Sequence, residues 1–85
     1  MPVLSRFLGI VIAMYYRQHL PAHFHAKYGD YEITVAIESG VVEGQFPRRA
    51  LRHTLEWYEL HVEELRANWR LAQQGEPLQP IAPLE

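Results

Sequence analysis

The stretch from Pro21 to Glu32 contains the feature that most constrains this chain, a Gly-Asp pair between two runs of strand-forming residues. Gly29-Asp30 in this setting is typical of a two-residue β-hairpin loop, because glycine readily adopts the positive φ that such a loop requires. A loop of fixed length also fixes which residues lie opposite each other in the two strands. The sequence therefore predicts a hairpin in which Tyr28 lies opposite Tyr31 and the second strand ends near Glu38.

The predicted register gives the hairpin one apolar and one polar face, because side chains alternate along a strand. The apolar pairs are Tyr28–Tyr31, Ala26–Ile33 and Phe24–Val35, and the pairs on the polar face are Lys27–Glu32, His25–Thr34 and His23–Ala36. A helix is expected to cover the apolar face. His23 and His25 therefore share the face that points away from the helix, which we call the histidine face.

Length and composition limit the class of protein. A chain of 85 residues is one small domain. Its net charge of -2 gives no general attraction to nucleic acid or to anionic membranes. It has no cysteine, which excludes a disulfide framework and a thiolate zinc site. The apolar run over residues 7–16 is too short to span a bilayer and lacks a signal-peptide cleavage site. We expect a cytoplasmic protein that has no membrane partner.

Two further strands are predicted on either side of the hairpin. Residues 7–16, after a six-residue lead-in, are apolar at every position, which indicates one strand covered on both faces. Ser39-Gly40 is a weaker loop signal, and residues 41–46 follow as a fourth strand. A two-residue loop here places Glu43 opposite Ala36, on the histidine face.

Pro47 begins a long helix that ends at Gly75. Its apolar residues form one stripe: Leu51, Leu55, Tyr58, Val62, Leu65, Trp69 and Ala72. The predicted fold is therefore α+β, with a four-stranded, mainly antiparallel sheet in ββββα order and one long C-terminal helix packed on one face. Residues 1–75 form the single domain, and residues 76–85 form a proline-rich extended tail.

The tail has apolar residues at every third position, Leu78, Ile81 and Leu84, between Pro77, Pro80 and Pro83. A period of three is that of polyproline II, so the three apolar side chains share one edge. This favours a tail docked on an apolar surface over a frayed terminus.

His23 and His25 are candidate metal ligands, because the His-x-His spacing on a strand points both imidazoles to one side. Glu43 or His19 would be the third ligand of a divalent transition metal. The alternatives are two solvent-exposed histidines, or one histidine that acts as a general acid or base without a metal.

Two more clusters lie on the predicted helix. The first is a candidate interaction surface beside the apolar stripe, made of Trp57, Leu60, His61, Glu64, Asn68 and Leu71. Its alternative is that His61 and Asn68 hydrogen-bond to loop backbone at the edge of the core. The second is a candidate anion site near the helix start, made of Arg48, Arg49 and Arg52. Its alternative is pairing with Glu56 and solvent, and the net negative charge disfavours nucleic acid as the ligand.

One set of residues and motifs is distributed over nearly the whole chain: Met1-Pro2, Ser5-Arg6-Phe7, Gly9-Ile10, Met14-Tyr15, His19-x-Pro21, His23-Phe24-His25-Ala26, Tyr28-Gly29, Glu56-Trp57, His61, Glu64-Leu65, Asn68-Trp69 and Ile81-x-Pro83-Leu84. In these residues the chain resembles the family catalogued as domain of unknown function 4160. The resemblance implies a small bacterial protein, often encoded beside a second small protein in pairs that include candidate toxin–antitoxin modules. The family pattern looks like Asp-His-x-Pro-Pro-His, whereas this chain has Gln18 and Ala22 in place of the acid and the second proline.

Two classes of function follow. The first is a non-enzymatic protein-interaction module that forms a homo-oligomer or binds a small partner protein, as a component of a toxin–antitoxin-like pair. The second is a small histidine-dependent or metal-dependent hydrolase, such as a nuclease, that uses His23 and His25. Convergence of His23, His25 and Glu43 in a cleft would favour the hydrolase.

Overall fold

The hairpin of β3 (His23–Tyr28) and β4 (Tyr31–Ala36) lies inside the sheet and has the register that its loop predicts. The computed structural model, which describes residues 2–85, pairs Tyr28 with Tyr31 and His25 with Thr34. All six predicted cross-strand pairs are confirmed. Gly29 in the loop has a φ of 58°, the left-handed conformation that makes glycine suitable there.

The apolar run at the N-terminus forms a second hairpin, so the prediction of one strand over residues 7–16 after a lead-in is wrong. It is divided between β1 (Val3–Phe7) and β2 (Ile10–Ala13), which pair antiparallel. The loop consists of Leu8 and Gly9, with φ values of 50° and 80°. A positive φ is uncommon for leucine, and the unbroken apolar sequence gave no other sign of a loop.

β5 (Val42–Gln45) pairs with β4 in a register two residues away from the predicted one. Glu43 lies opposite Thr34 instead of Ala36, because the connecting turn is longer than the Ser39-Gly40 pair. A shift of two residues keeps every side chain on its face. Glu43 therefore stays on the histidine face of an antiparallel sheet whose strand order is β1-β2-β3-β4-β5.

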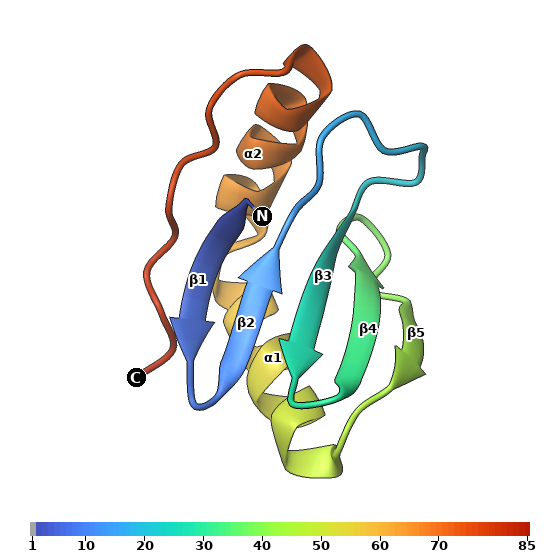
Figure 1. Ribbon diagram of the computed structural model, residues 1–85, viewed down its shortest axis with the longest axis vertical. Helices are drawn as coiled ribbons and strands as arrows, with labels where there is room; N and C mark the ends of the chain where they lie inside the picture. The colour runs from blue at the N-terminus through green and yellow to red at the C-terminus, as the bar shows by residue number, and fades with distance from the viewer. Residues whose placement is uncertain (1) are drawn as a thin grey trace.

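Two helices replace the single predicted helix and cover one face of the sheet (Figure 1). α1 (Arg48–Leu60) and α2 (Val62–Gln74) are separated at His61, which has a φ of -128° and a ψ of 24°. The break rotates α1 relative to the predicted stripe, so Thr54 and Trp57 are fully buried and Leu51 only partly. As predicted, the last helix ends at Gly75, which is in the left-handed conformation.

Apolar side chains from the sheet and both helices form one core. The buried members are Leu4, Phe7, Ile10, Ile12, Met14, Phe24, Ala26, Ile33, Val35, Ile37, Ala50, Trp57, Leu65, Trp69, Ala72 and Ile81. No helix in residues 2–85 is long and apolar enough to cross a bilayer.

The tail packs against its own chain. Figure 1 shows it running beside β1, and the Ile81 N–H donates a hydrogen bond of 2.8 Å to the Leu4 carbonyl oxygen. Ile81 is buried, while Leu78 and Leu84 are partly buried against the core. The docking that the period of three predicts is thus confirmed, and the surface beneath the tail belongs to the same chain.

Leu65→Ala should lower the free energy of unfolding by about 2–5 kcal/mol, because Leu65 is fully buried and its truncation leaves a cavity. The matched control is Leu60→Ala, since Leu60 is 67% exposed at the end of α1. The control should change stability by less than about 0.5 kcal/mol. Urea unfolding of both variants measures the difference, and equal losses would mean that the helices are packed otherwise.

Candidate functional site

The face of the sheet without helices contains a hollow of about 590 Å³. Its walls come from the β2–β3 loop, the first half of β3, the second half of β4, the β4–β5 connection and the start of β5. The lining residues are Gln18, His19, Leu20, Pro21, His23, His25, Thr34, Ala36, Ser39, Val41 and Glu43. All three candidate metal ligands thus line one hollow, which we call the histidine hollow.

The two strand histidines are each held at Nδ1 by an oxygen atom. His23 Nδ1 is 2.8 Å from the Pro21 carbonyl oxygen, and His25 Nδ1 is 3.0 Å from a Glu32 carboxylate oxygen. Since carbonyl and carboxylate oxygens only accept, both Nδ1 atoms carry the hydrogen. In the neutral imidazoles Nε2 is therefore the acceptor atom, the arrangement that suits ligand binding.

The rings around these histidines form an aromatic row. The His23 and His25 centroids are 5.3 Å apart, and Tyr15 meets His25 edge-on at 4.6 Å. At the other end His23 contacts Trp69 of α2 at 5.4 Å, so this histidine also touches the helical layer. The Nε2 atom of His25 is buried without a hydrogen-bond partner in the described part of the chain, which costs free energy.

The hollow does not assemble a set of metal ligands as it stands. Within residues 2–85 no group of three or more histidine or acidic side chains is placed to hold a metal ion. His19 is near, with its ring 6.0 Å from that of His23, but Glu43 lies two strands away from His25. Binding of a divalent transition metal by His23, His25 and Glu43 stays a prediction.

The candidate interaction surface on the helices is largely occupied by the tail. Trp57 is fully buried, so its predicted exposure is wrong, and its Nε1–H donates to the Ala82 carbonyl oxygen at 2.8 Å. Asn68 holds the tail by two hydrogen bonds: its Nδ2 donates to the Gln79 carbonyl oxygen at 3.0 Å, and its Oδ1 accepts from the Gln79 N–H at 2.7 Å. The alternative role for Asn68, a bond to backbone at the edge of the core, is confirmed.

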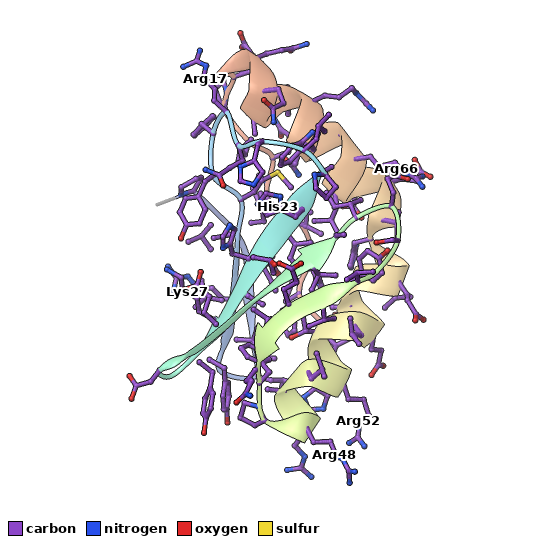
Figure 2. The ribbon with its side chains drawn as sticks, turned by 90° about the vertical axis from the view of Figure 1, so that its right-hand side faces the viewer. Arg17, His23, Lys27, Arg48, Arg52 and Arg66 are labelled. Atoms are coloured by element: carbon purple, nitrogen blue, oxygen red, sulfur yellow. The ribbon has the colours of Figure 1, made fainter. Side chains whose placement is uncertain are left out.

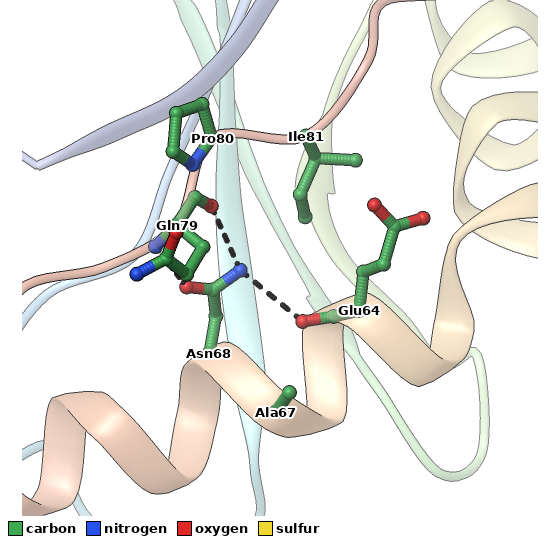
Figure 3. Close-up of a pocket in the computed structure, with 6 residues that line it drawn as sticks. All are labelled: Glu64, Ala67, Asn68, Gln79, Pro80 and Ile81. Atoms are coloured by element: carbon green, nitrogen blue, oxygen red, sulfur yellow. Dashed lines mark hydrogen bonds between the residues drawn. The ribbon is translucent and has the colours of Figure 1, made fainter.

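Figure 3 shows this contact, with Asn68 between the backbone of Gln79 and that of Glu64. A hollow of about 90 Å³ remains between α2 and the tail. His61, whose Nδ1 is 2.5 Å from a Glu64 carboxylate oxygen, lies beside Trp57, and its ring makes no hydrogen bond to loop backbone within residues 2–85. Leu71 is half-buried, so only Leu60 of the predicted surface is a well-exposed apolar side chain.

The arginine cluster is separate from the histidine hollow. Figure 2 shows Arg48 and Arg52 at one end of the molecule, at the start of α1, and His23 nearer the other end. The helix start has no side-chain cap and no acidic residue in its first turn. Arg49 and Arg52 line their own hollow together with Tyr28. The arginines therefore do not place a phosphate beside the histidines.

Sequence reasoning missed the rim of the histidine hollow. Leu20 and Val41 are 75% and 57% exposed, and both lie in connections whose course depends on contacts distant in sequence. The local signal for Leu20 was that a large apolar residue follows the polar residues Gln18 and His19 in a predicted loop. Tyr15 was placed on a buried strand, whereas it stands next to His25 beyond the end of β2.

The fold and the site define a small α+β protein with an antiparallel sheet, helices on one face and a histidine-lined hollow on the other. The chain belongs to the family described as a domain of unknown function (DUF4160), which it matches over residues 9–70. No curated protein and no solved structure matches it. The family carries no established activity, so function is argued from the site.

The β4–β5 connection is tied to α2 by Arg66, whose Nε and Nη2 donate to the two carboxylate oxygens of Glu38 at 2.9 Å each. These hydrogen bonds hold the pKa of the Glu38 carboxyl below its ordinary value. A carboxyl whose pKa is lowered on folding stabilises the fold above its unfolded pKa, and this contribution is lost as the pH falls through the folded value.

Glu38→Gln should therefore lower the melting temperature slightly at neutral pH, and the difference from the unmodified chain should be smaller at about pH 3, below the ordinary carboxyl pKa. Glu59→Gln, at an exposed position on α1, is the matched control and should show little effect at either pH. Melting curves of both variants and of the unmodified chain at the two pH values measure these differences. A difference that is equally large in acid would mean that Glu38 acts through packing.

Proposed function

We propose that this protein is a non-enzymatic interaction module whose histidine hollow receives a segment of a small partner protein. The observation that carries the proposal is the open sheet face, with a hollow of about 590 Å³ between exposed apolar side chains. Exposed apolar groups around a concave surface mark association sites. Leu20 and Val41 are the largest of these groups at the rim.

The edge of the sheet next to the hollow supports the same function. β1 lies under the tail, whereas β5 has no neighbouring strand on its outer side among residues 2–85. An unpaired edge strand offers backbone hydrogen bonds to an extended segment. A segment paired with β5 would lie beside Glu43 and could reach over the hollow.

The partner we propose is a second protein. The sequence features that predicted a homo-oligomer are used within one chain: the apolar run forms a hairpin, Trp57 fills the core and the tail docks on α2 and β1. The family resemblance implies that a second small protein is often encoded nearby. We propose that this neighbour is the partner and that the two form a toxin–antitoxin-like pair.

A hydrolase is the less supported alternative. His23 and His25 have the geometry of ligands or general bases, but Glu43 is not brought to them as a third ligand and the arginines lie elsewhere. The lining hydroxyls of Thr34 and Ser39 have no hydrogen bond to either imidazole among the described residues, so no activated nucleophile is formed. The arrangement supports binding better than catalysis.

Leu20→Asp and Val41→Asp should each weaken binding of the neighbouring gene's product by at least about tenfold, because a charge on the rim opposes burial of the apolar contact. Leu60→Asp is the matched control, since Leu60 is similarly exposed but outside the hollow. Calorimetric titration with purified partner measures the affinities, and melting curves check the folds. Equal weakening by all three variants, or by none, would contradict the proposal.

A further inference from the structure

We propose that the histidine hollow recognises an arginine side chain of the partner segment. This inference rests on the proposed function and specifies the chemistry of its contact. It follows from the charge of the lining, from the state of the two imidazoles and from the spacing of the acceptors across the sheet.

The lining of the hollow is poor in cations and rich in acceptors. Glu43 is its one formally charged residue, and neither lysine nor arginine lines it. The face does carry Lys27, but that side chain lies beyond His25 and over the Tyr15 ring, 5.8 Å from its centroid. A hollow with a carboxylate and no lining cation attracts a positively charged group.

The imidazoles strengthen this preference. Both Nδ1 atoms already donate, to Pro21 and to Glu32, so in the neutral rings only Nε2 remains and it can only accept. His25 Nε2 lacks a donor in the described part of the chain. A carboxylate or phosphate in the hollow would meet the lone pair of His23 Nε2 and the carboxylate of Glu43, whereas a group with several N–H donors would satisfy both.

The spacing favours a guanidinium over an ammonium group. His25, Thr34 and Glu43 lie in one row across β3, β4 and β5, and neighbouring strands are about 4.8 Å apart. The backbones of β3 and β5 are therefore about 10 Å apart. This leaves room above Thr34 for a planar group that donates hydrogen bonds toward both strands.

The test uses the full chain labelled with ¹⁵N and the capped tripeptide acetyl-Val-Arg-Val-amide. The matched control peptide carries citrulline, which keeps the shape of arginine without its charge. The arginine peptide should shift the signals of His23, His25 and Glu43 at millimolar concentration and bind roughly tenfold more tightly than the citrulline peptide. Equal binding of both peptides, tighter binding of a glutamate peptide, or no shift with arginine would overturn the inference.

A second experiment uses the Glu43→Gln variant, which should bind the arginine peptide roughly tenfold more weakly than the unmodified chain does. Glu59→Gln, at an exposed position on α1, should leave the affinity for the arginine peptide unchanged. Melting curves check that both variants are folded. Arginine binding that is unaffected by Glu43→Gln would overturn the inference.

The two proposals fail differently. If the partner protein binds and Leu20→Asp weakens it, but the arginine peptide neither binds nor competes, the interaction function holds and the arginine inference is wrong. If the arginine peptide binds as expected but the neighbouring protein does not, the hollow has the proposed chemistry and the choice of partner is wrong.

Discussion

The register of the β3–β4 hairpin is the constraint on which the rest of the structure depends. The Gly29-Asp30 loop sets that register, and through it the face on which every side chain of the two strands lies. A slip of one residue would expose Phe24 on the open face and bury His25 under the helices. The same short loop thus determines both the core and the lining of the histidine hollow.

Those parts of the fold that depend on local chemistry could be predicted, and those that depend on distant packing could not. The hairpin pairs and the helix end at Gly75 follow from residues that favour particular backbone angles. The loop at Leu8-Gly9 could not be seen, because it lies inside the unbroken apolar run of residues 7–16. The helix break at His61 could not be predicted either, because the helical pattern of apolar residues continues on both sides of it.

Some residues of the candidate site were placed correctly from the sequence, and others were not. His23, His25 and Glu43 were placed on the correct face, because a register error of two residues does not change the face. Trp57 was misplaced because its exposure was inferred from a single straight helix, whereas the break turns it into the core. The rim residues could not be found from sequence, since their positions depend on how the loops fold over the sheet.

The docked tail limits how many chains the sheet can join. Residues 76–85 run beside β1, and the Ile81 N–H donates to the Leu4 carbonyl oxygen, so the tail covers this edge and β5 is the edge left open among the described residues. Chains with two open sheet edges can join without limit into a fibre, whereas a chain with one open edge can pair with only one other edge. The stoichiometry of any complex formed by strand addition is therefore fixed by a segment that does not take part in it.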